Sequence, residues 1–304
     1  MRTVYFANGV RGLRCLEAML DAREEVVAVV GHPGEKADVL RRAEAAGLPT
    51  YQPEKVNSPS FVQEMGRLEP DLFVLSGYNR ILRAEIIGVP RKGCINLHGG
   101  KLPEYRGCAP INWQIVNGER TGGCCVLYVD EGIDTGDIIS QAYYDILETD
   151  TSQDIVEKQL ALFPPMLLQA MADLKNGVLK ATPQDKMAGC YYTRRYPRDG
   201  LIQWHAMTAA HVYNLVRSLA DPYPNAFTYH RGTKVRVRRV ERIVPPVKGV
   251  PGRMPLKRPD GVVICCQDEA LLVTEIAFED DGAPCAPNDA FPIGTDFGLS
   301  EKGR

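Results

Sequence analysis

The sequence predicts an α/β fold: a doubly wound, mostly parallel sheet followed by a smaller, mainly β domain. Three observations support this prediction. Short apolar runs alternate with amphipathic stretches as far as residue 177, which is typical of successive β-α-β units. The composition changes after about residue 189, where Pro, Gly, Tyr and charged residues gather. The chain of 304 residues exceeds one ordinary domain, so we expect domains over 1–190 and 202–304, joined by a linker over 191–201.

The larger domain opens with strands and helices in turn. Residues 3–7 and 26–30 are apolar runs of strand length, whereas residues 12–22 carry Leu13, Leu16 and Leu20 at helical spacing. The remaining expected elements are a helix at 36–47, an extended piece at 49–53, a helix at 58–68, a strand at 71–77, a short helix in the 80s, a strand at 93–98, a helix near 110–117, strands at 122–130 and 137–146, and a helix at 152–177 in which Pro164 and Pro165 favour a bend.

The second domain reads as one helix and several strands. After the linker, a helix is expected over 206–220, and residues 226–243 read as two strands around a His-Arg-Gly turn. Residues 261–266 and 270–278 are further strands. In the basic run 231–242, Arg236, Arg238 and Glu241 fall on different phases of a regular strand, so they do not all project from the same face. The sequence therefore predicts that a stripe of charge along this strand is interrupted.

Composition excludes several classes of function. The net charge of −2 provides no global basic field for nucleic acid or an anionic membrane. No apolar run approaches the roughly 20 residues of a spanning helix, and the first strand follows the N-terminus without a leader segment. Nine cysteines without a C-x-x-C pair predict free thiols and no metal site. We therefore expect a soluble, cytoplasmic globular protein without a membrane partner.

Two glycine-rich turns do not match nucleotide-binding motifs. "NGVRG" at 8–12 follows the first strand but lacks the G-x-G-x-x-G pattern, and no acidic residue closes a second strand about 20 residues on. The "GEK" at 34–36 lacks the spaced glycines of a P-loop. Both are interpreted as structural turns, so nucleotide hydrolysis is not expected.

The stretch "GCINLHGGKLPEYRG" at 93–107 carries the strongest functional signal. Asn96 and His98 are two residues apart on an expected strand, so they project from the same face, opposite to Ile95 and Leu97. In open α/β sheets ligands bind beyond the carboxyl ends of the strands, where the two following glycines allow a close approach of the backbone. A polar pair that merely satisfies loop groups is the alternative.

Three ordered segments resemble one family. "INLHGGKLPEYRG" is similar to the N-x-H-x-S-L-L-P-x-Y/W-R-G signature of the 10-formyltetrahydrofolate-dependent formyltransferases. "GYNRIL" at 77–82 resembles the folate-pocket segment of that family, and "YVDEGIDTGDII" at 128–139 resembles the loop that carries its catalytic Asp. The resemblance implies a Rossmann-like catalytic domain and an OB-like second domain. This sequence departs from the signature at Gly100 and Lys101, where the family usually has Ser-Leu.

The chemistry assigns roles to three residues, and the resemblance assigns the same three. Formyl transfer to an amine needs a proton acceptor, for which His98 is suited because imidazole titrates near neutral pH. Asn96 can donate a hydrogen bond to the developing oxyanion. Asp134 would stabilise the charged imidazole. Cys94 and Cys108 are expected to be bystanders, because the reaction needs no covalent enzyme intermediate.

The resemblance also implies the binding residues. The co-substrate is 10-formyltetrahydrofolate, and the residues expected beside it are Tyr78, Arg80, Ile81, Leu82, Asp130 and Ile133. The residues expected beside the acceptor are Tyr105, Arg106, Asn112, Arg194 and Arg195. The neighbouring Trp113 could contact the acceptor or belong to the core. The alternative for Arg194 and Arg195 is a run of solvated charges in the linker. The cis or trans state of Leu102–Pro103 is left open.

The acceptor expected from the resemblance is a nucleotide-linked amino sugar. Within the family the chain most resembles enzymes acting on UDP-4-amino-4-deoxy-L-arabinose, which implies lipopolysaccharide biosynthesis and a homodimer. The alternative acceptor is methionyl-tRNA; enzymes of that type carry a longer, basic insertion after the second strand, whereas here residues 31–35 pass directly towards a helix. Nucleic acid is therefore not the expected partner. A 10-formyltetrahydrofolate hydrolase using the same triad is a further alternative.

Overall fold

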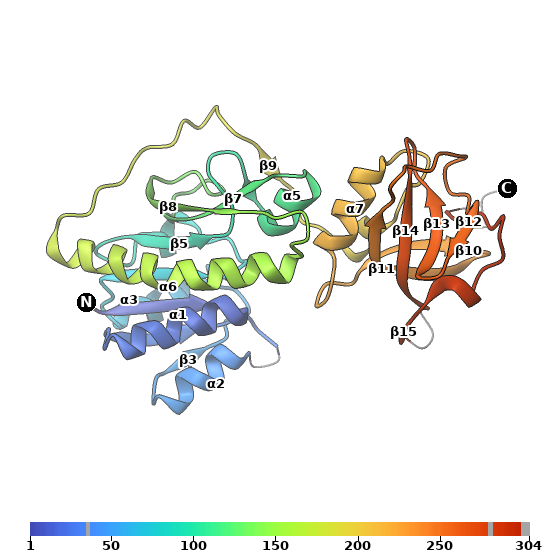
Figure 1. The fold of residues 1–304 in the computed structure, drawn as a ribbon. Helices are drawn as coiled ribbons and strands as arrows, with labels where there is room; N and C mark the ends of the chain where they lie inside the picture. Colours follow the sequence, from blue (N-terminus) through green and yellow to red (C-terminus); the bar gives the residue numbers. More distant parts are fainter. Residues whose placement is uncertain (35–36, 279–281, 299–304) are drawn as a thin grey trace. The chain divides into compact units, whose positions relative to one another are not determined.

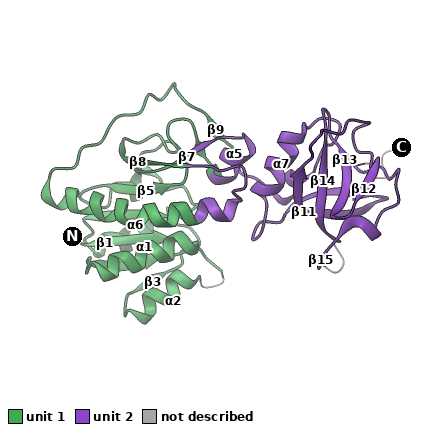
Figure 2. Cartoon of the chain, in the orientation of Figure 1, with its two compact units in different colours: residues 1–110, 122–144, 157–192 green, residues 111–121, 145–156, 193–304 purple. Residues whose placement is uncertain are grey.

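The structure is a computed structural model that describes residues 1–34, 37–278 and 282–298. The chain forms two compact units, and each is discontinuous in sequence (Figure 2). The first unit comprises residues 1–110, 122–144 and 157–192. The second comprises 111–121, 145–156 and the described residues from 193 onward. Two segments from within the first 190 residues therefore belong to the second unit.

The first unit is built on a mostly parallel sheet, as predicted (Figure 1). Its strands are β1 (Thr3–Ala7), β2 (Val26–Val30), β3 (Thr50–Tyr51), β4 (Leu72–Ser76), β5 (Cys94–His98), β7 (Thr121–Tyr128) and β8 (Ile138–Asp145). They lie in the order β3-β2-β1-β4-β5-β7-β8, and β7 runs antiparallel to β5. The chain order reverses on the two sides of β1. Because β1, β4 and β5 run parallel, their carboxyl ends lie at one edge of the sheet.

Helices cover both faces of this sheet. They are α1 (Gly9–Asp21), α2 (Asp38–Ala45), α3 (Pro59–Arg67), α4 (Ala84–Ile87) and α6 (Ser152–Asn176), whereas α5 (Pro110–Val116) belongs to the second unit from Ile111 onward. Alternate residues of each strand enter different cores: Tyr5 packs with residues of α1, α2 and α6, whereas Phe6 packs with residues of α3 and α4. This two-sided burial explains why the strands read as continuous apolar runs. The predicted helix at 36–47 begins at Asp38, and residue 36 lies outside the described residues.

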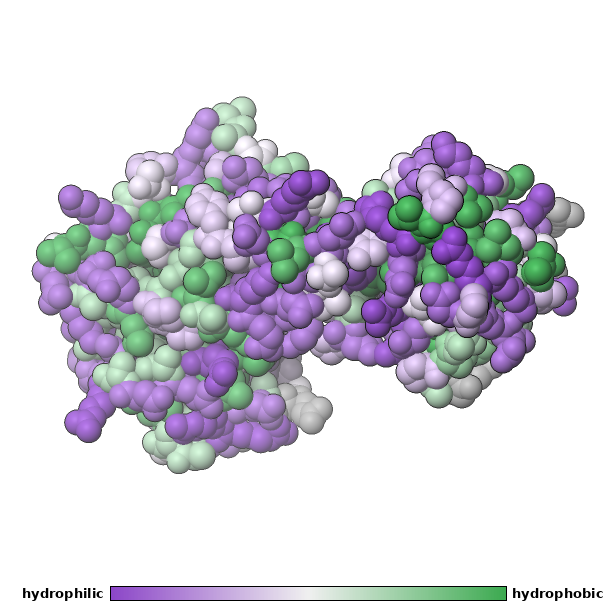
Figure 3. Space-filling view, in the orientation of Figure 1, coloured by the Kyte–Doolittle hydropathy of each residue, from purple (hydrophilic) through white to green (hydrophobic). Residues whose placement is uncertain are grey.

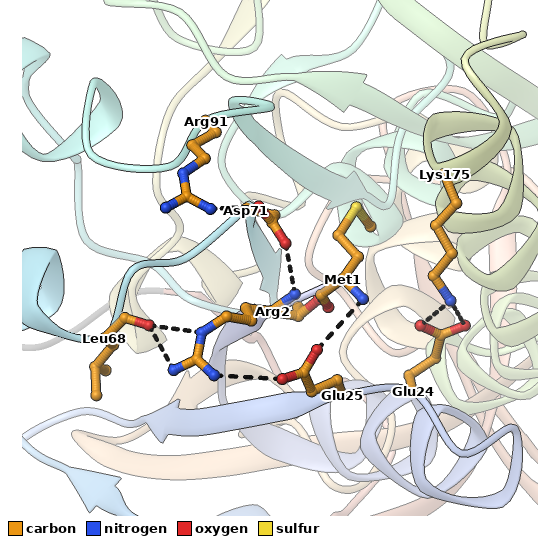
Figure 4. A network of polar contacts seen from close by, with 9 residues as sticks. Met1, Arg2, Glu24, Glu25, Leu68, Asp71, Arg91 and Lys175 are labelled. Atoms are coloured by element: carbon orange, nitrogen blue, oxygen red, sulfur yellow. Dashed lines mark hydrogen bonds and ion pairs between the residues drawn. The ribbon is translucent and has the colours of Figure 1, made fainter.

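The amino edge of the sheet is held by charged groups (Figure 4). Arg2 donates from Nε (3.0 Å) and Nη2 (2.8 Å) to the Leu68 carbonyl and from Nη1 to Glu25 (3.3 Å). Asp71 accepts from the Arg2 backbone amide (2.9 Å) and from Arg91 (3.4 Å), and these hydrogen bonds lower its pKa despite the opposing effect of burial. The polar groups of this edge are occupied by one another.

The second unit is an antiparallel β structure; besides most of α5 and the first residues of α6, its described residues form one further α-helix. Its elements are η1 (Pro197–Gly200), α7 (Ala209–Ser218), β10 (Ala226–His230), β11 (Thr233–Arg242), β12 (Leu256–Arg258), β13 (Gly261–Cys265), β14 (Ala270–Phe278), β15 (Pro284–Cys285) and η2 (Pro287–Asp289). The main path of its sheet is β10-β11-β14-β13-β12, and β15 pairs with β14. The predicted mainly β character of this part is confirmed.

The predicted interruption of the β11 charge stripe assumed a regular strand, and β11 is not regular. The register with β14 shifts between Val237 and Val240, which is the mark of a β-bulge. Val235, Val237 and Val240 are all buried in one core cluster, so the extra residue restores a common inward face. The alternation of a regular strand therefore does not hold across Arg238 and Arg239, and the interruption of the stripe stays a prediction. Arg238 is not an isolated charge there, because it pairs with Glu275 (Nε to Oε1, 2.6 Å) and with Asp221.

The outer surface mixes polar and apolar residues. On the face shown in Figure 3, hydrophilic and hydrophobic residues are interspersed over both units. No helix within the described ranges is long and apolar enough to cross a membrane. All nine cysteines are free thiols, six of them buried.

Candidate active site

The carboxyl end of β5 presents the predicted polar pair. Ile95 and Leu97 are buried in the core beneath α1 and α6, while Cys94 lies in the core on the other side of the sheet. Asn96 and His98 project on the Cys94 side, as the alternation predicts. His98 is only 5% exposed, so its ring is held by protein contacts.

Asp134 reaches this pair from the loop between β7 and β8. One carboxylate oxygen lies 3.4 Å from Asn96 Nδ2, and the other lies 3.5 Å from His98 Nδ1 and accepts the Gly107 backbone amide at 2.9 Å. The Asp134 backbone is left-handed, with φ of 53°, a conformation that Asp tolerates better than most residues. The three predicted catalytic residues, distant in sequence, are thus brought together.

The other ring nitrogen of His98 meets a backbone carbonyl. Nε2 lies 2.6 Å from the Tyr105 carbonyl oxygen, and because this oxygen can only accept, Nε2 carries the proton when the contact is made. Gly100 makes the contact possible: a Cβ there would lie 2.7 Å from the Tyr105 oxygen and 2.9 Å from Nε2. The departure from the usual Ser at this position therefore has a local structural reason.

Segment 182–192, which follows α6, borders the site and was not singled out by the sequence (Figure 1). Its Thr182 forms a β-bridge with Ile138, and β9 (Tyr191–Tyr192) pairs with β6 (Arg106–Gly107). Gln184 donates from Nε2 to the carbonyl oxygens of Asp134 (3.0 Å) and Gly136 (2.7 Å). A neutral side chain in an irregular segment carries no periodic or motif signal, which is why it was missed.

The residues predicted beside the folate lie at the ends of β4 and β7. Tyr78 is buried, and among the described residues its hydroxyl has no hydrogen-bond partner; burial raises its pKa to about 12, although the charge of Arg80 acts in the opposite direction. Arg80 donates to the Glu54 carbonyl (2.6 Å), and Leu82 is buried in the core with α3 and α4. Ile81 is 67% exposed, an unusual state for its apolar side chain.

The loop after β7 carries the other two predicted folate contacts. Asp130 accepts from the Thr135 hydroxyl (2.6 Å) and the Gly132 amide (3.0 Å) and pairs with Lys186 (3.2 Å). Burial raises its pKa, but these three partners outweigh that effect, so its pKa lies below the usual value. Ile133, in the same loop, is half exposed.

His32 was missed as a neighbour of this region. Its ring lies 4.7 Å from that of Tyr78, and its Nε2 accepts the Asn79 backbone amide at 3.3 Å. Burial and the nearby charge of Arg80 lower its pKa. The neutral ring therefore helps to hold the turn that follows β4. A lone His in a loop gave the sequence reading no reason to choose it.

The predicted acceptor contacts are divided between the units. In the first unit, Tyr105 is buried and stacks on Tyr192 with ring centroids 4.7 Å apart, and Arg106 is 1% exposed. Asn112 belongs to the second unit, where its amide donates to the Ser218 carbonyl (2.6 Å). Arg195, also in the second unit, lies over the Trp113 ring at 4.7 Å, whereas Arg194 is exposed. Their roles with an acceptor stay predictions.

Two further points concern the site. The Leu102–Pro103 peptide bond, whose state the sequence left open, is cis. Within the described part of the chain, no group of three or more His, Cys, Asp or Glu side chains is placed to hold a metal ion.

These features define a class of protein. A carboxylate between a buried His and an amide, at the carboxyl edge of a mostly parallel α/β sheet, is an arrangement that can move a proton to or from a bound molecule.

The chain belongs to the formyl transferase family. Residues 1–171 match the family's formyl transferase domain, and residues 195–289 match its C-terminal domain. The protein is accordingly a folate-dependent formyltransferase.

Individual relatives agree with this membership. The chain is 33% identical over 290 residues to a methionyl-tRNA formyltransferase of Acetivibrio thermocellus, covering 92% of each. Its fold is similar to that of HypX from Aquifex aeolicus in complex with tetrahydrofolic acid (TM-score 0.66, 18% identity, 95% of this chain and 46% of that one). It is also similar to an N-formyltransferase from Helicobacter canadensis in complex with folinic acid and dTDP-3-aminofucose (TM-score 0.67, 18% identity, 90% and 98%).

Proposed function

We propose that the protein transfers a formyl group from 10-formyltetrahydrofolate to the amino group of methionyl-tRNA. The observation that carries this proposal is the identity of 33% to a methionyl-tRNA formyltransferase over 92% of both chains. The sugar acceptor expected from sequence motifs has weaker support, because the similar sugar enzyme is only 18% identical and its likeness shows the fold alone.

The residues at the end of β5 supply the chemistry in this proposal. The amine nitrogen attacks the formyl carbon, the bond from that carbon to the folate nitrogen breaks, and the amine loses a proton. His98 accepts this proton and returns it to the departing folate nitrogen, which leaves as N–H; its Nδ1 faces the Asp134 carboxylate (3.5 Å), which stabilises the charged ring in between. To act through Nε2, the ring must release the Tyr105 carbonyl. Asn96 donates its amide N–H to the formyl oxygen as that oxygen gains negative charge.

The residues at the end of β4 fit a folate. The buried Tyr78 hydroxyl, unpaired among the described residues, would gain a hydrogen bond from a polar heterocycle. Ile81 and Ile133 expose apolar side chains that a flat ring could cover. The pteridine of 10-formyltetrahydrofolate is both a flat ring system and a heterocycle with polar atoms. When bound, the folate supplies the activated formyl group.

A nucleotide-linked amino sugar is the second candidate acceptor, and one specific observation favours it. β2 ends at Val30 and α2 begins at Asp38, so the connection is too short for the long basic insertion associated above with tRNA enzymes. The amine chemistry at His98 is the same for both acceptors. The two candidates therefore differ in acceptor recognition and not in mechanism.

The test compares acceptors directly. The full-length protein and 10-formyltetrahydrofolate are incubated with charged initiator tRNA, with a panel of nucleotide-linked amino sugars, or with neither, and products are followed by mass spectrometry. We expect formyl-methionyl-tRNA, with an apparent affinity that falls by a slope of about 0.7–0.9 in log units per phosphate contact as log salt rises. Turnover of a sugar without any formylation of tRNA would reverse the assignment. Formate release at the same rate without an amine would indicate a hydrolase.

A further inference from the structure

Segment 182–192 contacts the backbone that carries Asp134. Gln184 provides the central contact, because its single amide group donates to the carbonyls of Asp134 (3.0 Å) and Gly136 (2.7 Å). Lys186 pairs with Asp130 (3.2 Å) at the start of the same loop, and the backbone of Thr182 exchanges two hydrogen bonds with Ile138 at its end (2.9 and 2.8 Å). The loop that presents Asp134 is therefore held along its length.

Arg106 fixes Gln184 in turn. Its Nε and Nη2 donate to Gln184 Oε1 at 3.2 and 2.9 Å, and it also donates to the carbonyls of Asp185 (3.0 Å) and Ala188 (2.9 Å). Its guanidinium lies over the Tyr191 ring, 5.4 Å from the centroid. The side chain is 1% exposed, so these protein acceptors compensate a buried charge. Arg106 is thus used within the protein, although the sequence predicted an acceptor contact for it.

We propose that Gln184 is a positioning residue for the reaction: it holds the Asp134 main chain so that the carboxylate faces His98 and Asn96, and Arg106 anchors Gln184. The neighbouring amide of Gly107 donates to the same carboxylate at 2.9 Å, so Asp134 is held from the Arg106 loop and from segment 182–192 together. The inference rests on the proposed roles of His98 and Asp134 in proton transfer.

The physical reason lies in the conformation of Asp134. Its φ of 53° is a left-handed state that a side chain other than Gly adopts at a cost, so the loop needs external contacts to remain in it. A rotation of this backbone would swing both carboxylate oxygens away from distances of 3.4 and 3.5 Å that are already at the limit of useful contact. A misplacement of about 1 Å in a catalytic constellation can lower a rate about a hundredfold.

Gln184→Glu is the sharpest variant. The new side chain has the same shape and keeps an acceptor oxygen for Arg106, but the atom facing the two carbonyls can no longer donate. If Gln184 acts through Asp134, this variant loses kcat about as much as Gln184→Ala, by about tenfold to a hundredfold. If Gln184 serves merely to hold Arg106, Gln184→Glu keeps nearly wild-type kcat, which overturns the proposal.

A double-mutant cycle with Asp134→Ala separates positioning from a general loss of stability. Once the carboxylate is removed, moving its backbone has little further effect, so Gln184→Glu should lower the remaining kcat by less than about threefold in that background. Equal losses in both backgrounds contradict the proposal. The matched control is Asn288→Ala, because the Asn288 amide also donates to two carbonyls, those of Arg258 (2.9 Å) and Pro259 (3.0 Å). It should leave kcat unchanged.

A readout without an acceptor keeps this proposal distinct from the choice of substrate. Hydrogen exchange of the Gly107 amide, followed by NMR, reports its contact with the Asp134 carboxylate. We expect exchange to accelerate at least about tenfold in Gln184→Glu and to be unchanged in Asn288→Ala. Unchanged exchange in Gln184→Glu would overturn the proposal, whatever the acceptor is found to be.

Discussion

His98 is the residue on which the proposed proton transfer depends. Replacing it with Ala should lower kcat by about 10²–10⁴ and leave tetrahydrofolate binding nearly unchanged, because the general base is lost while the pocket at Tyr78 remains. Steady-state kinetics and calorimetric binding provide the two measurements. Asn96→Ala and Asp134→Ala should also lower kcat strongly, and their effects should not add to that of His98→Ala. His211→Ala, at an exposed helix position in the second unit, is the control. Near-wild-type turnover without His98 would eliminate the mechanism.

Gly100 leaves the space in which His98 meets the Tyr105 carbonyl. In Gly100→Ala the new Cβ would lie between 2.7 and 2.9 Å from the atoms of that contact, so the ring or the carbonyl must move. We expect kcat to fall about tenfold, with the folded state retained. Gly66→Ala is the matched control, because nothing lies within 4 Å of a Cβ at that helical position. Unchanged kcat in Gly100→Ala would show that the contact is dispensable.

His32 should make folate binding sensitive to pH. Its pKa is lowered by burial and by Arg80, so the neutral ring contributes stability above the ordinary value of about 6.5, and this contribution is lost as pH falls through the lowered pKa. Protonation also ends the contact with the Asn79 amide. We expect tetrahydrofolate affinity, measured by calorimetry, to weaken as pH falls below the ordinary His value of about 6.5 in the wild type and less so in His32→Gln. Identical profiles for the two would contradict this role.

Residue patterns found part of the site because strand alternation is a strong constraint. The period of two placed Asn96 and His98 on one face, and the structure agrees. Asp134 followed from family resemblance, since nothing local shows that a loop 36 residues after His98 returns to it. Arg106 carried a charge that suggested a ligand, whereas the structure buries it against carbonyls that no sequence spacing links to it.

Among the elements, segment 182–192 depends on a glycine. Gly189 has φ of 82°, and a Cβ there would collide with the Pro103 carbonyl, whereas Gly177 has φ of 69° with nothing within 4 Å. Gly189→Ala should therefore destabilise the fold by about 1–3 kcal/mol more than Gly177→Ala, which meets backbone strain alone. Urea denaturation of both variants checks the difference. Equal losses of stability in the two variants would mean that the segment moves away from the new Cβ at no energetic cost.

Regular elements were predictable and irregular ones were not. The long buried strands and amphipathic helices were identified within a few residues, because burial imposes periods of 2 and 3.6. The β11 bulge does not follow this rule, because an extra residue changes the phase of the strand and alternation no longer predicts which side chains share a face. Helix α6 includes Pro164 and Pro165 and continues to Asn176.

At the scale of the whole molecule, the chain passes between its two units several times. Val116 is buried in the core cluster that also contains Ile202 and Leu215, and the Asn112 amide donates to the Ser218 carbonyl. A fragment of residues 1–201 therefore loses partners for groups that stay in it. The Asn112 amide keeps its hydrogen bond to the Ser152 hydroxyl (3.2 Å) in this fragment and loses the one to Ser218, which costs about 0.5–1.5 kcal/mol. We expect the fragment to bind tetrahydrofolate but to melt several degrees below the full-length protein in calorimetry.

The result is compared with full-length Asn112→Ala, which removes the same amide while keeping the apolar cover. This variant should melt between the fragment and the wild type. A fragment as stable as the intact chain would show that residues 111–121 do not need the second unit.

Segment 182–192 also has a consequence for biosynthesis. Translation is vectorial, and Gln184 leaves the ribosome 50 residues after Asp134. A nascent chain that has completed the seven strands of the sheet already carries Asn96, His98 and Asp134, yet the amide that fixes Asp134 is still unmade. If Gln184 acts as inferred, such an intermediate can capture folate while transferring formyl slowly. Ribosome-stalled chains in which Gln184 is still inside the exit tunnel and chains in which it has left the tunnel would then differ sharply in turnover, so that enzymatic competence is acquired late in synthesis.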